Sequence, residues 1–321
     1  GVEAVKKLAA RADVLLHNYR PGVMDRIGLG SDVLRKINPR LVYVAVSGFG
    51  KEGPMANKPA FDHVIQGMSG LTNLQSPDDN GFDHIRTFIC DKVTSYTVCQ
   101  AATAALVARA TTGEGQHIDI SMLHACLAFM WPDGMMHRTL KDDDRFEMSP
   151  GADYFQTLNF SDGAVAVAAL TDNHWKALLP LIGYPELLDT PLFSSIASRM
   201  SNMKEVGKVL KNPRLDIGVE KAVAALKAAD VPCAPCLHQD EIEANEQIQA
   251  IDALETYVTQ AMGKLTVPRP PVQFDGATTS QAEPSPLLGE HSREVLSELG
   301  WDHSSIDQLI GTGTVLITAL P

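Results

Sequence analysis

The sequence has few of the features that mark secreted, membrane-spanning or nucleic-acid-binding proteins. Five cysteines among 321 residues are too sparse, and odd in number, for a disulfide framework, which indicates a reduced cytoplasmic protein. The longest apolar stretches, such as Cys126 to Trp131, are far shorter than the ~20 residues that span a bilayer. No block of lysine or arginine offsets the net charge of -12, so neither nucleic acid nor an anionic membrane is an expected partner.

Two of the cysteines, Cys233 and Cys236, are separated by two residues, and His238 stands two positions further on. This spacing occurs in redox motifs and in one half of a zinc site. A zinc site needs a second pair of ligands, and the sequence offers none at a suitable spacing. We therefore expect these cysteines to be small residues of a strand, and we expect no metal.

Short apolar strands alternate with helical segments in the first third of the chain. The run from Arg40 to Ser47 is almost continuously apolar and β-branched, which is typical of a parallel strand covered by helices on both faces. The pattern predicts an α/β, Rossmann-like sheet, and such sheets bind ligands at the carboxyl ends of their strands. The expected strands are residues 13–18, 40–47 and 116–122, and the expected helices are residues 2–12, 22–37, 91–109 and 123–136.

Beyond residue 153 the pattern changes to mixed helices and strands. The turn Ser161-Asp-Gly163 lies between two apolar runs and predicts a β-hairpin. A stretch dense in proline, serine and threonine near residue 275 predicts a second linker. We expect a large domain at 1–140, a linker at 141–153, a small α+β domain at 154–267, a linker at 268–286 and a C-terminal helix within 287–321 that returns to the large domain.

Asp91 is the most informative single residue. It follows the apolar run of residues 85–90, which we interpret as a strand, and it stands at the start of an alanine-rich helix. One interpretation is an N-cap, whose carboxylate accepts a hydrogen bond from the first helical turn. The other is a nucleophile, since a carboxylate at a helix start is held as an anion and can attack a thioester. Periodicity alone favours the cap.

Several other polar residues have both a structural and a functional interpretation. Arg20, Arg26 and Lys58 lie in or beside expected loops, either as solvated residues or as a clamp for phosphate groups. His124 stands on an apolar helix face and is more readily explained as a core or interface histidine than as a catalytic one. Gly48 and Gly50 lack the third glycine of a dinucleotide-binding turn, which disfavours NAD and ATP.

Several short motifs, taken together and in order, resemble the family III CoA-transferases, which include formyl-CoA and carnitine CoA-transferases, and whose sister group is the α-methylacyl-CoA racemases. The resemblance extends over nearly the whole chain. Its motifs are Asn18-Tyr-Arg-Pro-Gly-Val23, Gly28-Leu-Gly30, Ser47-Gly-Phe-Gly50, Asp62-His-Val-Ile-Gln-Gly-Met-Ser-Gly70, Thr112-Gly-Glu-Gly-Gln116, Val231-Pro-Cys-Ala-Pro235 and Pro286-Leu-Leu-Gly-Glu-His291.

The resemblance implies a role for particular residues. The family's catalytic aspartate falls on Asp91, which would form an aspartyl mixed anhydride and then an aspartyl-CoA thioester. The coenzyme A contacts of the family fall on Asn18, Tyr19 and Arg26, and a further one on Lys58 to within a residue. The resemblance also implies an acyl-CoA donor, a small carboxylic acid acceptor and an interlocked homodimer.

The chain departs from its relatives at three places. The racemases have a histidine where this chain has Phe61, which cannot transfer a proton, so the transferase is favoured. The alternative is a CoA-ester racemase or isomerase that pairs Asp91 with His63 or His84. The glycine-rich loop of formyl-CoA transferase is not reproduced, and Ser149-Pro-Gly-Ala-Asp153 is the nearest candidate.

The third departure is at the beginning of the chain. Relatives open with further strand–helix–strand units, whereas this chain starts at Gly1 in what we expect to be a helix. We therefore expect a fragment or a chain that another polypeptide completes. A truncated relative that binds or dimerises without catalysis is the second alternative.

Overall fold

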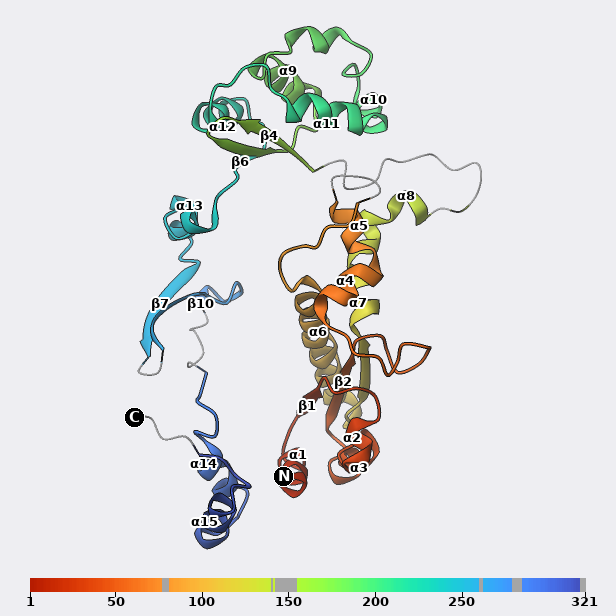
Figure 1. The fold of residues 1–321 in the computed structure, drawn as a ribbon, viewed down its shortest axis with the longest axis vertical. Coiled ribbons are helices and arrows are strands. Elements are labelled where there is room, and N and C mark those ends of the chain that lie inside the picture. Colours follow the sequence, from red (N-terminus) through yellow and green to blue (C-terminus); the bar gives the residue numbers. More distant parts are fainter. Residues whose placement is uncertain (77–80, 140, 142–154, 260–261, 279–284, 318–321) are drawn as a thin grey trace. The chain divides into compact units, whose positions relative to one another are not determined.

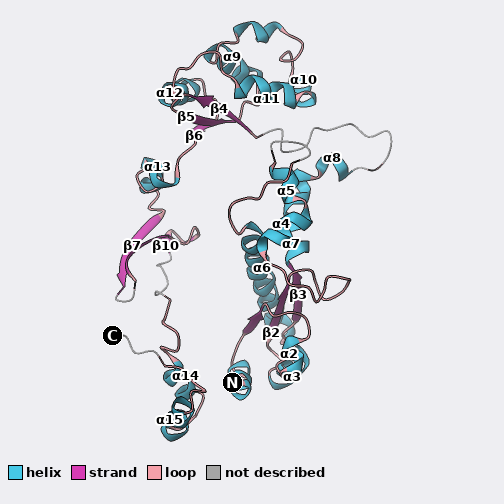
Figure 2. Cartoon of the chain, in the orientation of Figure 1, coloured by secondary structure: helices cyan, strands magenta, loops and turns pink. Residues whose placement is uncertain are grey.

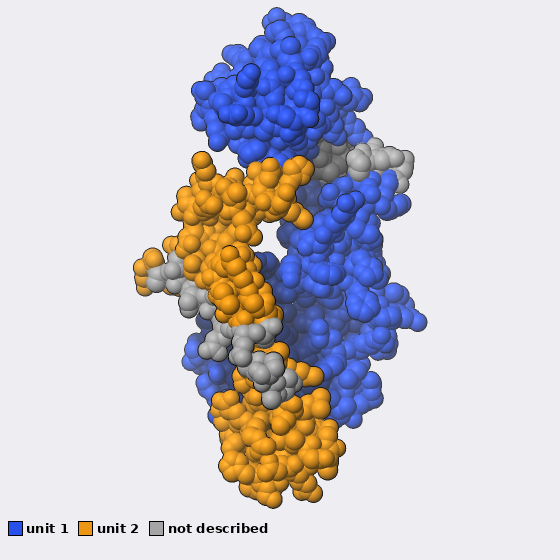
Figure 3. All heavy atoms as spheres, turned by 60° about the vertical axis from the view of Figure 1, so that its left-hand side comes forward, with its two compact units in different colours: residues 1–236 blue, residues 237–321 orange. Residues whose placement is uncertain are grey.

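The computed structural model describes every residue except 77–80, 140, 142–154, 260–261, 279–284 and 318–321 (Figure 1). The chain divides into two compact units, residues 1–236 and residues 237–321 (Figure 3). The first unit contains a parallel sheet with its helices and a separate antiparallel sheet with its own core. The division into domains and linkers expected from the sequence stays a prediction.

The parallel sheet is three-stranded, in the order β1 (Val14–His17), β2 (Val42–Ser47) and β3 (His117–Ser121). His17 pairs with Ala45, and Ser47 pairs with Ser121, so the three strands run in the same direction and their carboxyl ends share one edge. The structure thus confirms a mixed α/β fold with a parallel sheet, as the apolar run at residues 40–47 predicts.

Helices cover both faces of this sheet (Figure 2). Alternate side chains of a strand point to opposite faces, so Val42, Val44 and Val46 pack against the long helix α6 (Ile89–Thr112). Tyr43 and Ala45 face the other way, toward helices near the start of the chain. These helices are α1 (Val2–Ala9), α2 (Val23–Arg26) and α3 (Ser31–Ile37).

In the described residues, three helices lie between β2 and β3, and two others come directly after β3. They are α4 (Asp62–Ser69), α5 (Leu71–Gln75), α6, α7 (Met122–Gly134) and α8 (Met136–Thr139). An apolar cluster of Ile65, Cys90, Cys126 and Met130, each at most 6% exposed, joins α4, the start of α6 and α7. This cluster fixes where α6 begins.

The antiparallel sheet has its own hydrophobic core, which includes Leu158, Trp175 and Leu226. The turn Ser161-Asp-Gly163 joins its first two strands, as the sequence predicts. Its elements are β4 (Gln156–Phe160), β5 (Gly163–Val167), α9 (Asp172–Leu181), a 3-10 helix η2 (Pro185–Asp189), α10 (Ile196–Ser201), α11 (Met203–Lys211), α12 (Val219–Ala228) and β6 (Cys233–Pro235).

The second unit holds two short hairpins and several short helices. Its elements are η3 (Gln239–Glu241), α13 (Glu246–Ala250), β7 (Leu254–Thr259), β8 (Gly263–Pro268), β9 (Gln273–Phe274), β10 (Ala277–Thr278), α14 (Ser292–Glu298) and α15 (His303–Gly311). Gly300 takes a φ of 84° just after α14, a conformation typical of a glycine that ends a helix. Over the part of the chain that is described, no helix is both long and apolar enough to cross a membrane.

Two expectations about local structure are wrong, and two further elements had no expectation. Residues 85–88 are irregular and residues 89–90 are helical, so no strand precedes Asp91. Residues 22–37 form two helices, because Gly28 takes a positive φ of 76° between them. The strand β7 and the helix α15 were not expected.

Candidate active site

Asp91 is the third residue of α6. The helix begins at Ile89, and its N-cap position is occupied by Phe88, whose side chain makes no capping hydrogen bond. The interpretation of Asp91 as the N-cap is therefore wrong. Its exposed carboxylate stands in the first turn, where the free N–H groups and the helix dipole favour a negative charge.

A buried carboxylate holds the backbone of Asp91 in place. Asp62 is the first residue of α4 and is 3% exposed. Its Oδ2 accepts a hydrogen bond from the backbone N–H of Asp91 at 2.9 Å, and its Oδ1 accepts one from Nε2 of Gln66 at 2.6 Å. Asp62 thus occupies one of the N–H groups that the start of α6 leaves unpaired.

Gln66 fixes the other end of the same segment. Its side chain is 2% exposed, and its Oε1 accepts a hydrogen bond from the N–H of Ile85 at 3.0 Å. Its Nε2 lies 3.2 Å from both the carbonyl oxygen of Ile85 and that of Thr87. Residues 85–91 are therefore held at both ends by two side chains that lie one turn apart on α4.

The environment of Asp91 changes its acidity. Partial burial and the neighbouring charge of Asp62 raise the pKa of the Asp91 carboxyl above its ordinary value, and Lys92 opposes them. Cys90, the preceding residue, is fully buried, and burial together with its contact to the thiol of Cys126 raises the pKa of its own thiol. The site thus offers an exposed carboxylate whose pKa is higher than usual and whose backbone is held by a hydrogen bond to Asp62.

A cavity of about 240 Å³ lies over the sheet, near the carboxyl ends of β1 and β2. Tyr19, 57% exposed, is the only residue of the expected coenzyme A site among its lining residues. The guanidinium of Arg26 lies beside Gly22, at 3.4 Å from where a β-carbon would stand, and Gly22 itself lines the cavity. The side chains of Asn18, Arg20 and Lys58 are exposed, and they do not line it.

Charged residues that the sequence analysis did not single out also line this cavity. Lys51 donates to Asp119 Oδ2 at 2.8 Å, and this bond raises the pKa of the lysine. His17 stacks near Tyr19, and burial together with the nearby His117 lowers the pKa of its imidazole. The signal available from the sequence was position, because His17 is the last residue of β1 and Lys51 lies four residues after the end of β2, in the loop at the carboxyl edge of the sheet.

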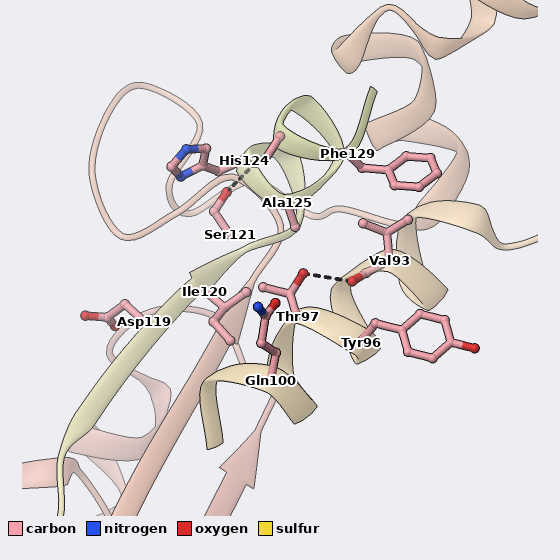
Figure 4. A pocket seen from close by; sticks show the side chains of 11 residues that line it. Val93, Tyr96, Thr97, Gln100, Asp119, Ile120, Ser121, His124, Ala125 and Phe129 are labelled. Atoms are coloured by element: carbon pink, nitrogen blue, oxygen red, sulfur yellow. Dashed lines mark hydrogen bonds between the residues drawn. The ribbon is translucent and has the colours of Figure 1, made fainter. Parts of the chain in front are cut away.

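A larger cavity of about 620 Å³ lies between α6, β3 and α7 (Figure 4). Its lining residues on α6 include Val93, Tyr96 and Gln100, which at ~100° per residue lie roughly 140–200° around the helix from Asp91. His124 lines this cavity and is exposed, so it is not a core histidine, and its interpretation as an interface histidine stays a prediction. The residues of α6 that line this cavity thus lie on the side of the helix opposite to Asp91.

The two histidines named as alternative partners of Asp91 lie together. His63 stacks parallel to Phe61, which is 68% exposed, with ring centroids 6.3 Å apart. His84 meets His63 edge-on, also at 6.3 Å. Both histidines are exposed and adjoin the segments that Asp62 and Gln66 hold.

Of the two cysteines expected in one strand, Cys233 lies in β6 and Cys236 follows directly after it. Within the described residues no group of three or more histidine, cysteine, aspartate or glutamate side chains has a metal-binding arrangement. All five cysteines are unpaired. The loop candidate at residues 149–153 lies outside the described residues.

Known proteins resemble this chain over almost all of its length. It is 29% identical to a succinyl-CoA:glutarate CoA-transferase of Mus musculus over 322 residues, covering 98% of this chain and 73% of the relative. It is 32% identical to an acetyl-CoA:oxalate CoA-transferase of Acetobacter aceti, covering 91% and 75%.

The fold is also found among solved structures. A CAIB/BAIF family protein from Brucella suis matches with a TM-score of 0.75 and 30% identity, covering 93% of this chain and 78% of that one. The sequence pattern described as CoA-transferase family III matches residues 1–292. The family match covers most of the chain and the relatives and the fold agree with it, so the chain belongs to the family III CoA-transferases.

Proposed function

We propose that this protein moves coenzyme A from an acyl-CoA donor to a small carboxylic acid, with Asp91 as the nucleophile. The observation that carries the proposal is the arrangement around Asp91, whose carboxylate is exposed while its backbone is fixed by Asp62. The raised pKa of this carboxyl makes it a stronger base than an ordinary aspartate and supports the role of nucleophile.

The reaction divides into two exchanges at the same carboxylate. An oxygen of Asp91 attacks the thioester carbon, the C–O bond forms as the C–S bond breaks, and a mixed anhydride and CoA thiolate result. The thiolate attacks the side-chain carbonyl of Asp91 and releases the donor acid as a carboxylate, leaving an aspartyl-CoA thioester. The acceptor carboxylate then repeats these two steps in reverse order, which yields the new acyl-CoA and restores the carboxylate of Asp91. No proton or electron is consumed.

We place coenzyme A along the carboxyl ends of β1 and β2. Tyr19 offers an aromatic face beside the cavity, and Arg26 reaches its edge at Gly22. Asn18, Arg20 and Lys58 complete the set, as exposed donors on the loops nearby. Arginine and lysine side chains suit the phosphates of coenzyme A, the arginines through paired hydrogen bonds.

The names of similar proteins suggest the kind of acceptor. They are named for transfer between succinyl-CoA and glutarate, formyl-CoA and oxalate, and acetyl-CoA and oxalate. We propose a small carboxylic acid of this kind. We further propose an interlocked homodimer in the cytoplasm, a compartment in which the five unpaired cysteines would stay reduced.

A direct assay separates the candidate functions. The chain is incubated with succinyl-, acetyl- or formyl-CoA and with glutarate or oxalate, and new CoA esters are sought by mass spectrometry. A new ester that requires both substrates, and that Asp91→Ala abolishes, is the expected result. Failure of every pair would leave a non-catalytic relative as the better description.

The second candidate is a CoA-ester racemase or isomerase, and the observation in its favour is that His63 adjoins Asp62, which is hydrogen-bonded to the backbone of Asp91. It would use Asp91 and one of these histidines to remove and return a proton at the α-carbon. Phe61 counts against it, since a phenylalanine side chain carries no exchangeable proton. Incubation of an acyl-CoA in deuterated water without acceptor acid distinguishes the two, because α-deuteration would exclude the simple transferase.

A further inference from the structure

Asp62 and Gln66 take no direct part in the steps proposed above, yet both are buried and both are hydrogen-bonded to the segment that ends at Asp91. Both are at most 3% exposed, and they lie beside the apolar cluster that joins α4, α6 and α7. Burial of a carboxylate costs several kcal/mol unless partners compensate it. A buried charge at this position therefore requires an explanation.

Asp62 has two hydrogen-bond partners, and neither is a cation. It accepts hydrogen bonds from the side-chain amide of Gln66 and from the backbone N–H of Asp91. Both donors are uncharged, and no ion pair neutralises Asp62 in the described residues. The two oxygens of this carboxylate are therefore satisfied as hydrogen-bond acceptors by groups that bring no positive charge.

That charge acts on Asp91. Asp62 on α4 raises the pKa of the Asp91 carboxyl, while Lys92, on α6 itself, lowers it. The titratable group that α7 brings to the same cluster is the thiol of Cys126, which contacts Cys90. The two carboxylates thus repel each other across a fixed hydrogen bond to the backbone of Asp91.

Acylation removes this repulsion. When the carboxylate of Asp91 becomes an anhydride or a thioester its charge disappears, so a neighbouring negative charge destabilises the free form more than the acylated form. The hydrogen bond from the N–H of Asp91 to Asp62 holds the backbone of Asp91 in place during these steps. The hydrogen bonds of Gln66 to Ile85 and Thr87 hold the segment that precedes α6.

We propose that Asp62 and Gln66 are positioning residues of this site. Asp62 fixes the backbone of Asp91 and supplies the charge that favours its acylation, and Gln66 orients Asp62 and holds the segment that leads to Asp91. The inference rests on the proposed role of Asp91 as nucleophile.

Two substitutions separate charge from geometry. Asp62→Asn keeps the shape and one acceptor oxygen but removes the charge, whereas Asp62→Glu keeps the charge and lengthens the side chain. The matched control is Asp83→Asn, which removes an exposed carboxylate from the same irregular segment. Circular dichroism shows which variants fold, and Asp62→Glu carries the test where Asp62→Asn does not fold.

The readouts are the titration of the Asp91 carboxyl by ¹³C NMR and the kinetics of CoA transfer. In Asp62→Asn the Asp91 carboxyl is expected to titrate at lower pH, and kcat to fall about 10- to 100-fold with KM for the acyl-CoA unchanged. In Asp62→Glu the titration is expected to stay raised, while kcat falls because the longer side chain displaces the amide of Asp91.

The outcomes distinguish this inference from the proposed function. A wild-type chain that transfers CoA, with variants at Asp62 that neither shift the titration of Asp91 nor lower kcat, overturns the positioning role. A wild-type chain that transfers nothing, with a titration of Asp91 that still moves in Asp62→Asn, overturns the proposed function and leaves the electrostatic coupling established.

Discussion

Gln66→Met tests the anchoring of the active-site segment by a single buried amide. Methionine has nearly the same length and volume, so the change removes hydrogen bonds without opening a large cavity. The wild-type amide has four partners, at Asp62, at the N–H and carbonyl of Ile85 and at the carbonyl of Thr87.

The magnitude follows from which groups lose their only partner. The carbonyl of Ile85 also accepts from the N–H of Thr87, and the carbonyl of Thr87 also accepts from Ile89, so both keep a hydrogen bond. The N–H of Ile85 and Oδ1 of Asp62 have no replacement among the described residues. A buried polar group without a partner costs about 1–3 kcal/mol, so the two together cost ~2–6 kcal/mol.

Hydrogen exchange measured by mass spectrometry reads this cost locally. Because a loss of ~2 kcal/mol corresponds to about 30-fold faster opening, amides in the peptide spanning residues 85–91 are expected to exchange at least that much faster. Gln100→Met is the control, since Gln100 is an exposed residue of α6, and its exchange is expected to match the wild type. Unchanged exchange at residues 85–91 in Gln66→Met would refute the anchoring argument.

Three further predictions concern other parts of the chain. Gly115→Ala places a β-carbon against the carbonyl oxygen of Leu41 and is expected to destabilise the chain by ~2 kcal/mol or more. Gly67 lies in a helix, where an added β-carbon meets no atom within 4 Å, so Gly67→Ala is expected to stabilise the chain by ~0.5–1 kcal/mol. Urea denaturation measures both changes. Arg199→Met removes a side chain that is 3% exposed and bonded to a buried carbonyl, at an expected cost of ~2–4 kcal/mol, while Arg214→Met, in an exposed ion pair, should cost less than ~1 kcal/mol. Folding raises the pKa of Asp91, so the stability that this group contributes is present at acid pH and is lost as the pH rises through the folded pKa. Asp91→Asn is therefore expected to have a higher melting temperature than the wild type at neutral pH and the same melting temperature below about pH 4. A wild-type advantage at neutral pH would contradict that sign.

Much of the parallel sheet is readable from the sequence, because local pattern and tertiary position agree there. The apolar run at residues 40–47 is buried on both faces as β2, and the alanine-rich stretch after Asp91 is the helix against it. The failures are at boundaries. The start of α6 depends on Asp62, which lies 29 residues earlier, and no local pattern reveals a contact of that range.

The same distance explains what was missed at the site. Asp62 and Gln66 stand one helical turn apart within a motif already noticed, so their shared face was available from the sequence. Their partners at residues 85–91 were not, since the intervening chain carries no periodic signal. The strand β7 was missed for a different reason. Its exposed side includes an apolar residue, Val258, which is 77% exposed, so the strand shows no clean alternation of apolar and polar residues.

Trapping with hydroxylamine tests the central claim most directly. After incubation with an acyl-CoA donor, an anhydride or thioester on Asp91 is cleaved to a hydroxamate, which mass spectrometry detects on the peptide spanning residues 85–92. The account predicts this adduct on Asp91 in the wild type and in Asp83→Asn, and its absence in Asp91→Asn. Transfer of CoA with no adduct on Asp91, or with an adduct on another carboxylate, would contradict the account.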